Sequence, residues 1–424
     1  MNQSVLIDVD ALRVGMFIQL DLGWVNHPFP MSSFRLSSPD QIRVLREIGL
    51  KAVRYVPAKS TQVPERRVTA VEDAAAVVSE HGNDAAVSEK VPATDLLAQL
   101  SASQERCNQR FQHATGVYAA VSASVQAAPQ QARQDAEDLI TSCVLDLLER
   151  GPCTVHLLPD GLGQRSAVHA VNVMVLALLL GQAMGLQAQQ LRGLGLAALL
   201  HDLGKVNLPT YIGEPGAPLR PTDMPRYQSH VGLSVELGQS MGLPSDVLIA
   251  IAQHHEMADG SGYPLHLVAE DIGRWGRILA LVNRYDRLCN PLHGEPALTP
   301  HEAVARLFAL LRRSFDATVL GAFIRLMGVY PPGSLVQLVD GRYAAVMLVD
   351  SSRPLRPCVL PYQPDVPRSE ATVLNLAQLP ELGILRSLKP AQVPRAALEY
   401  LLPQPRICYF FERALNSPDR GDAA

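Results

Sequence analysis

The stretch Ala197-Ala198-Leu199-Leu200-His201-Asp202-Leu203-Gly204-Lys205 decides how this chain of 424 residues is interpreted. Its apolar half is typical of a buried helix, which we expect to begin near Gln190 and to end at the His-Asp pair. Gly204 is placed to terminate this helix, because glycine readily adopts the backbone conformation that ends helices. An imidazole and a carboxylate at the end of an apolar helix indicate chemistry in addition to packing.

Further histidines lie near the ends of other predicted helices. His169 begins an apolar helix that runs to residue 186, and His230 begins one that runs to about residue 241. Ser245 can cap the next helix, whose far end presents His254 and His255. Seven of the 12 histidines fall between residues 156 and 266. We therefore expect several helix ends to converge on one pocket.

Five imidazoles and one carboxylate are a ligand set that suits two transition-metal ions, because a carboxylate can bridge them. Two ions together can bind a phosphoryl group and lower the pKa of a water between them. Taken singly, each histidine is more often structural than metal-bound. The joint pattern, followed by Asp259-Gly260-Ser261-Gly262-Tyr263-Pro264, favours a dinuclear metal site.

The composition limits the partners of the chain. A formal net charge of −4 provides no basic surface for duplex nucleic acid, so an anionic substrate must be held by local groups. The six cysteines include no Cys-x-x-Cys pair, which is typical of reduced thiols in the cytosol. No signal-peptide pattern begins the chain. Residues 170–186 contain Asn172 and Gln182 and are interpreted as a buried helix, so we expect a soluble cytoplasmic protein without a membrane span.

Patterns of hydrophobicity indicate a multidomain protein whose first part, residues 1–58, is a small mixed α/β domain. Apolar runs of strand length occur near its beginning and its end, and Ser38 or Asp40 could cap a short helix between them. An aromatic loop in this part is interpreted as a packed corner in preference to a ligand site. Its residues are Trp24, His27, Pro28 and Phe29.

The rest of the chain is expected to be mainly helical until a β-rich end. Residues 59–95 are interpreted as a linker and residues 96–150 as a helical segment. Residues 151–328 form a longer helical region that carries the predicted ligands. Residues 329–412 are expected to be a small β-rich appendage, in which Asp340-Gly341 is a hairpin signal, and residues 413–424 a tail. The predicted fold is an all-α core flanked by a small N-terminal mixed domain and a small C-terminal β-rich appendage.

The region around the histidines resembles the HD-GYP subgroup of the HD-domain metal-dependent phosphohydrolases. The resemblance covers about residues 150–330, in the order and approximate spacing of that family. It rests on His169, His201-Asp202-Leu203-Gly204-Lys205, His230, His254-His255-Glu256 and residues 259–264. The first sixty residues also resemble the small domain that often precedes HD-GYP regions, through Gly15-Met16 and the aromatic loop.

This resemblance implies an all-helical domain that hydrolyses cyclic di-GMP to pGpG or GMP with two divalent transition metal ions, iron or manganese. Asp202 would be the bridging carboxylate, and Lys205 would hold a phosphate oxygen or the attacking hydroxide. These two are the candidate catalytic residues. The positions that match metal ligands of the family are His169, His201, Asp202, His230, His254 and His255.

The turn after the double histidine has an implied role of its own. It would shape the pocket wall or form a contact surface for diguanylate cyclase domains. Its residues are Gly260, Gly262, Tyr263 and Pro264. The helical segment 96–150 could pair between two copies of the chain, as in a homodimer, or pack within its own chain.

The chain departs from the family pattern at three places. Asn283 stands where the family has a further aspartate ligand, which predicts a weaker metal site; Asp286, one helical turn on, could take its place. Leu292 and Glu295 stand where the family has cations that hold phosphate. Arg165 replaces a glutamate with which some members bind a third metal, so we expect two ions at most. Cations near the missing clamp that could compensate, or be plain surface charges, are Arg274, Arg284 and Arg287.

Three functions are consistent with these observations. The first is a metal-dependent phosphodiesterase acting on cyclic di-GMP, weakened by Asn283 and by the missing phosphate clamp. The second is a catalytically degenerate HD-GYP module that acts as a nucleotide sensor or protein-interaction domain in signalling. The third is an HD hydrolase for another phosphorylated nucleotide.

Overall fold

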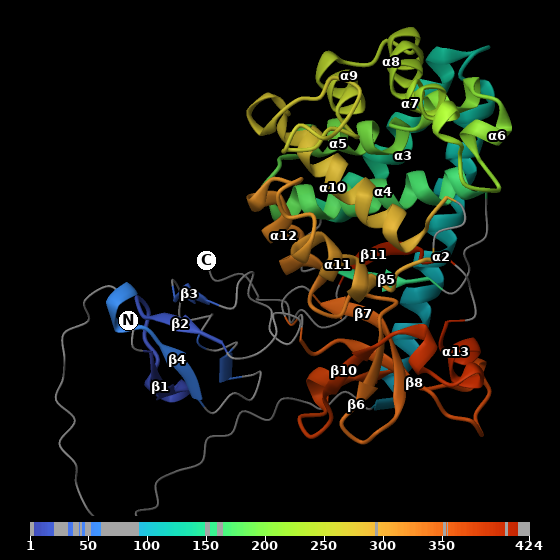
Figure 1. Ribbon diagram of the computed structural model, residues 1–424. Helices are drawn as coiled ribbons and strands as arrows, with labels where there is room; N and C mark the ends of the chain where they lie inside the picture. The colour runs from blue at the N-terminus through green and yellow to red at the C-terminus, as the bar shows by residue number, and fades with distance from the viewer. Residues whose placement is uncertain are drawn as a thin grey trace, which may run out of the picture. The chain divides into compact units, whose positions relative to one another are not determined.

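The computed structural model describes residues 4–20, 33–36, 42, 45–46, 52–60, 93–148, 153–158, 164–292, 296–350, 353, 355–402 and 406–413 (Figure 1). The chain divides into two compact units, Met1–Ala98 and Gln99–Ala424. The predicted aromatic loop, Ser38, Asp40 and Glu295 lie outside the described residues. So do most of the predicted linker 59–95 and of the tail 413–424.

The first unit contains a sheet of four antiparallel strands with a small core of its own. Across the sheet the order is β1 (Val5–Asp8), β4 (Ala52–Tyr55), β2 (Phe17–Gln19) and β3 (Ser33–Arg35). The buried residues of this core are Val9, Leu12, Ile18, Leu20, Leu36, Ile42, Leu45 and Val53. The strands β1, β2 and β4 coincide with the apolar runs of strand length in the sequence.

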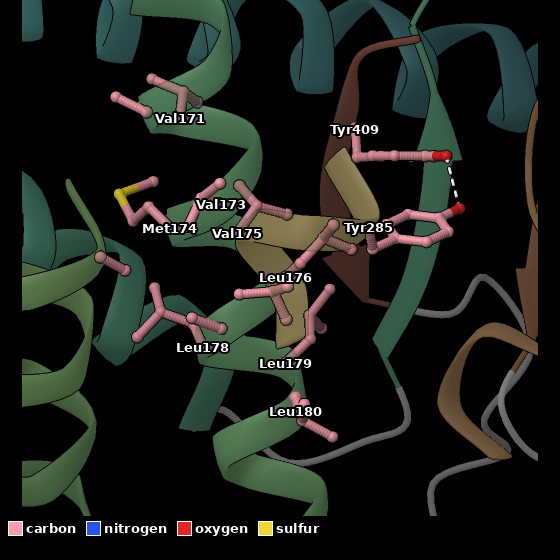
Figure 2. Packing of buried hydrophobic residues seen from close by; sticks show 14 of the residues in the cluster. Val171, Val173, Met174, Val175, Leu176, Leu178, Leu179, Leu180, Tyr285 and Tyr409 are labelled. Carbon is pink, nitrogen blue, oxygen red and sulfur yellow. Dashed lines mark hydrogen bonds between the residues drawn. The ribbon is translucent and has the colours of Figure 1, made fainter. Parts of the chain in front are cut away.

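The second unit is built around helix α4 (Arg165–Ala183), which packs against α5 (Ala188–Leu200), α10 (Arg274–Cys289) and α12 (Ala317–Met327). Figure 2 shows its valine, leucine and methionine side chains spreading around the helix into this core. A helix that is apolar on every side is stable only when it is surrounded. Among the described residues, α4 is the one helix long and apolar enough to cross a membrane, and 83% of it is buried inside the protein. This burial is that of a core helix.

The remaining helices complete the helical part of the second unit. Two long helices precede α4, and the others follow α5. They are α2 (Ala93–Ser124), α3 (Pro129–Leu148), α6 (Thr210–Gly213), α7 (Met224–Gln228), α8 (His230–Ser240), α9 (Ser245–Ala252) and α11 (Pro300–Ala309). In the part of α2 whose side chains are described, Cys107, Phe111, Ala114, Tyr118 and Val121 are buried within the same chain.

Two predicted helix ends differ in detail from the structure. Gly204 does not adopt the left-handed conformation expected of a helix-ending glycine. Instead it lies in the 3-10 turn Leu203–Asn207, where a Cβ atom would come within 2.4 Å of both the His230 carbonyl oxygen and the Ser234 amide nitrogen. Glycine is required there because this turn packs directly on the backbone of α8. Ser245 lies inside the first turn of α9 and makes no capping bond, since Pro244 occupies the cap position.

A seven-stranded antiparallel sheet adjoins the helices in the second unit. The path β10-β6-β7-β5-β11 runs across it, and β8 and β9 extend it from β7. The strands are β5 (Cys153–Leu157), β6 (Leu335–Leu338), β7 (Tyr343–Asp350), β8 (Cys358–Pro361), β9 (Leu374–Asn375), β10 (Ile384–Leu388) and β11 (Tyr409–Arg413), with helix α13 (Arg395–Leu401) between the last two. The predicted hairpin is present: β6 and β7 pair, and Gly341 in their turn has φ 89°.

The strand β5 was not predicted, because the sequence placed residues 151–328 in one helical region. Its partners, β7 and β11, come from the C-terminal part of the chain, so its pairing leaves no local signal. The predicted appendage is therefore continuous with a strand that precedes the helical core. β11 also contacts α4, and the Tyr409 hydroxyl lies 2.9 Å from that of Tyr285 on α10 (Figure 2).

Candidate metal centre

The six predicted ligands lie together at one end of the helical core. His169 is the fifth residue of α4, and His230 is the first residue of α8. His201 ends α5, and Asp202 follows it directly. His254 and His255 come just after the end of α9. The sequence thus predicted correctly that several helix ends converge.

Asp202 lies at the centre of this group, and each of its oxygens faces a different pair of histidines. Its Oδ2 lies 3.4 Å from His169 Nε2 and 3.5 Å from His201 Nε2. Its Oδ1 lies 3.2 Å from His230 Nε2 and 3.7 Å from His254 Nε2. The ligand atoms therefore form two groups. The first consists of His169, His201 and Asp202, and the second of Asp202, His230, His254 and His255; within each group all ligand atoms lie within 4.8 Å of one another. Asp202 is common to both groups, as a bridging carboxylate must be.

Backbone contacts orient three of the imidazoles. The Nδ1 atoms of His201, His230 and His254 lie 2.6–2.7 Å from carbonyl oxygens three residues earlier in the chain. Since a carbonyl only accepts, Nδ1 carries the proton and Nε2 presents a lone pair toward Asp202. Burial lowers the pKa of His230 and of His254, which keeps these two rings neutral. Neutral imidazole with a free Nε2 is the form that binds metal.

The arrangement fits cations. His169 Nε2 and His201 Nε2 face each other at 3.2 Å, and so do His230 Nε2 and His254 Nε2. Two nitrogens that bind one ion at about 2.1 Å lie about 3.0–3.4 Å apart, so these pairs already have the spacing of ligands. Three of the buried polar atoms that have no hydrogen-bond partner among the described residues lie at this centre. They are Asp202 Oδ1, His255 Nε2 and Asn283 Oδ1.

Two side-chain cations also reach the centre. Lys205 Nζ lies 2.5 Å from Asp202 Oδ2, and Arg287 Nη2 lies 2.7 Å from the same oxygen. Burial acts to raise the pKa of Asp202, but the charge of Lys205 holds it well below its ordinary value. Asp202 is therefore a carboxylate with one oxygen bonded to two cations and the other oxygen without a hydrogen bond.

Comparison with known proteins agrees with this geometry. The HD domain family matches residues 155–319, and a domain of unknown function, DUF3391, matches residues 4–136. A cyclic di-GMP phosphodiesterase of Pseudomonas aeruginosa is 29% identical over 356 residues, which are 80% of this chain and 81% of that protein. Residues 155–319 of this chain are an HD domain.

Two further relatives match in shorter alignments. The cyclic di-GMP phosphodiesterase PdeB of Borreliella burgdorferi is 25% identical over 192 residues, 45% of this chain and 51% of that protein. The cyclic di-GMP phosphodiesterase response regulator RpfG of Xanthomonas campestris is 33% identical over 150 residues, 35% of this chain and 39% of that protein.

Asp286 does not replace the missing aspartate of the HD domain. Its Oδ2 lies 2.5 Å from His169 Nδ1, and its Oδ1 accepts hydrogen bonds from Asn172 at 2.8 Å and from Asn290 at 2.9 Å. Asp286 therefore orients the His169 ring from behind, and the sequence analysis did not identify this role. At the aligned position, Asn283 donates weakly to the His254 carbonyl oxygen at 3.4 Å. Its amide oxygen is the free group that a metal could bind.

The predicted turn lies against the second group of ligands. Tyr263 stacks on His255, with ring centroids 4.4 Å apart. Gly260 has φ 76°, and a Cβ atom on Gly262 would lie 2.3 Å from the Met257 amide nitrogen, so both positions need glycine. Pro264 follows Tyr263 through a cis peptide bond and is exposed.

Glu256 fixes this turn, and the sequence analysis gave it no role of its own. It is 1% exposed, and its two carboxylate oxygens accept hydrogen bonds from the Leu265 amide at 2.7 Å and the Leu267 amide at 2.9 Å. The signal in the sequence that could have identified Glu256 is an acidic residue directly after His254 and His255.

Three arginines could compensate for the missing clamp, and a fourth, Arg165, stands at the third-metal position of the family; all four have different positions. Arg274 donates to the Met184 carbonyl oxygen and Arg165 to the Leu292 carbonyl oxygen, at 2.5 and 2.8 Å. Arg284 is exposed. Arg287 alone among these four contacts a predicted ligand in the described part of the chain.

A further cluster of ligand-type residues lies away from this centre, between α2, β5 and β11. It consists of Cys107, His156 and Glu412. Its polar atoms are already paired: Thr154 Oγ1 lies 2.9 Å from His156 Nε2, and Arg106 donates to Glu412 at 2.6 Å. Burial raises the pKa of the Cys107 thiol to about 12, so it stays protonated. The contact between Arg106 and Glu412 joins α2 to the strand β11, which pairs with β5.

Proposed function

We propose that the HD domain is a metal-dependent phosphodiesterase that hydrolyses cyclic di-GMP to pGpG or GMP. The observation that carries the proposal is the pair of ligand groups that share Asp202, each with two Nε2 atoms 3.2 Å apart. The names of the relatives support the substrate. Iron or manganese suits a site of imidazoles and one carboxylate.

The predicted site residues would have different roles in metal binding and in substrate binding. His169 and His201 would hold one ion and His230, His254 and His255 the other, with Asp202 between them. Two bound ions would supply Lewis-acid polarisation of the phosphodiester and would lower the pKa of an attacking water. Lys205 is placed beside Asp202 to donate a hydrogen bond to a phosphate oxygen, and its ammonium lies 5.1 Å from the centroid of the Tyr227 ring.

A degenerate HD-GYP module that binds a nucleotide without turnover is the second candidate. It is favoured by Asn283, whose neutral amide replaces a charged ligand, and by the cations already bonded to Asp202 Oδ2. The two candidates make opposite predictions about turnover and the same prediction about binding.

The deciding experiment supplies the purified full chain with Fe²⁺ or Mn²⁺, measures bound metal by mass spectrometry, and follows cyclic di-GMP by chromatography. We expect product from the wild-type protein and none from His201→Ala or Asp202→Ala. Arg284→Ala, an exposed change on α10, is the matched control and should keep its activity. Bound metal with no product after long incubation would overturn the phosphodiesterase and leave the binding module.

The turn after the double histidine is also proposed as the contact surface for a diguanylate cyclase domain. Leu265 and Val268 are 61% and 44% exposed, and Glu256 holds the backbone between them through the Leu265 and Leu267 amides. Neighbouring exposed apolar side chains are typical of a protein-contact surface. Leu265→Asp should abolish co-elution with a purified cyclase domain, whereas Leu310→Asp, at an exposed site on another loop, should not.

A further inference from the structure

Arg287 binds the one carboxylate that both metal ions would share. Its guanidinium Nη2 lies 2.7 Å from Asp202 Oδ2, and its side chain is only 16% exposed. Lys205 Nζ lies 2.5 Å from the same oxygen. The other oxygen, Oδ1, has no hydrogen-bond partner among the described residues. The two halves of the centre therefore differ in their surroundings.

The two cations beside Asp202 Oδ2 affect where a metal ion can bind. Oδ2 faces His169 and His201, so a metal ion in that half would lie beside the charges of Lys205 and Arg287. Like charges held close together in a buried site repel strongly, because little water screens them. Oδ1 faces His230 and His254 and has no contact with a lysine or an arginine in the described part of the chain. Without substrate, the His230 half is the better site for metal.

Arg287 is also better placed to receive phosphate than the other arginines named above. Arg274 and Arg165 are bonded to backbone carbonyl oxygens elsewhere, and Arg284 is exposed. Guanidinium groups bind phosphate oxygens through paired, charge-assisted hydrogen bonds. A phosphate that approaches the centre would offer Arg287 a partner that competes with Asp202.

We propose that Arg287 exchanges partners on substrate binding: it bonds Asp202 and keeps metal out of the His169–His201 half until a phosphodiester of the substrate draws it away. The second ion then loads only when substrate is present. This inference rests on the proposed function, because the competing partner is the phosphate of a cyclic dinucleotide.

Two measurements on the full chain test this exchange without any turnover. The first is Mn²⁺ binding by calorimetry and by mass spectrometric metal content. The second is the affinity for a phosphorothioate analogue of cyclic di-GMP. The wild-type protein should bind about one Mn²⁺ tightly alone and about two with the analogue, whereas Arg287→Ala should bind about two alone. The same variant should bind the analogue about tenfold or more weakly, because a bidentate contact is lost.

These opposite changes distinguish the exchange from a purely structural role, which would weaken both kinds of binding. Arg284→Ala is the matched control and should behave as wild type, and Arg287→Lys should keep part of both effects. Circular dichroism checks that each variant is folded. Equal Mn²⁺ stoichiometry in Arg287→Ala and wild type overturns the inference, as does unchanged affinity for the analogue.

If Arg287→Ala gains metal while neither protein binds the analogue, the cyclic di-GMP function fails and the exclusion of metal by Arg287 stands. Failure of the inference and failure of the proposed function are therefore separate results.

Discussion

Asn283 is the residue at which this chain differs most clearly from a complete ligand set. Its side-chain oxygen is buried, has no hydrogen-bond partner among the described residues and carries no formal charge. An amide can bind a metal ion, but a carboxylate contributes charge that holds divalent cations more firmly. The position is thus a natural point at which metal affinity can be changed.

We expect Asn283→Asp to raise the affinity of the protein for Mn²⁺ by about tenfold, since one added charge–charge contact in a buried site contributes on the order of 1–2 kcal/mol. Calorimetric titration of the metal-free protein measures this directly. Asn375→Asp, in β9 of the sheet, is the control. An unchanged Mn²⁺ affinity would mean that the Asn283 oxygen does not reach a bound ion.

The buried imidazoles also predict how stability depends on pH. Burial lowers the pKa of His169 to about 3 and that of His156 to about 4, from an ordinary value of 6.5. Below pH 6.5 the unfolded chain therefore binds more protons than the folded chain, so stability is lost as the pH falls toward the folded values.

The melting temperature of the metal-free protein should accordingly drop between pH 7 and pH 5. Thermal unfolding followed by circular dichroism at several pH values is the measurement. His113 lies outside both clusters, so His113→Gln is a suitable control and should keep the same pH profile. A melting temperature that stays constant over this range would contradict the prediction.

At the scale of elements, the 3-10 turn after α5 matters because it brings Asp202 and Lys205 onto α8. The contact is close enough that Gly204 has backbone atoms of α8 within 2.4 Å of the place a Cβ would occupy. The Gly204 amide also donates to the Ser234 hydroxyl at 2.8 Å. Any side chain at residue 204 must push the turn, and Asp202 with it, away from His230.

Gly204→Ala should lower the free energy of unfolding by about 1–3 kcal/mol, as overpacking in a tight interior does, and should weaken Mn²⁺ binding as well. Gly232→Ala, on α8 itself, is the matched control, because nothing lies within 4 Å of its added methyl group. That change should stabilise the helix slightly. Urea unfolding of both variants distinguishes them, and equal stabilities would refute the role given to Gly204.

The elements also show what sequence could and could not predict. The helices that carry His169, His230 and His254 have strong local patterns, so their ends were predicted within a few residues. Gly204 was identified as special for the wrong reason, because its constraint comes from α8 and not from its own helix. The contacts of Asp286 with His169 and of Arg287 with Asp202 join distant segments. The sequence predicts that Asp286 and Arg287 lie on one helix, but it does not show which residues of other helices they contact.

At the scale of the whole second unit, the sheet is connected to the metal centre by hydrogen bonds. The Ile407 amide donates to Asn290 Oδ1 at 2.8 Å, and the Tyr409 amide donates to Asn172 Oδ1 at 3.0 Å. Both asparagines also bond Asp286, which orients His169. The strand that begins at Tyr409 thus supports a metal ligand through two side chains.

Asn290→Ala should therefore lower Mn²⁺ affinity about tenfold, which is typical for the loss of a group that supports a ligand. Its side chain binds no predicted ligand directly, so the effect would have to pass through Asp286. Asn375→Ala, which removes a turn cap in the sheet, should leave the affinity unchanged. Equal Mn²⁺ affinity of Asn290→Ala and wild type would show that Asn172 alone suffices.

The link from β11 to Asp286 also fixes an order of events during protein synthesis. All six ligands leave the ribosome well before Ile407 and Tyr409, so for an interval the nascent chain has its imidazoles but lacks the groups that hold Asp286 in place. His169 gains its final orientation only when the last described strand has joined β5. If that half binds metal as proposed, we expect its loading to be a late step of maturation.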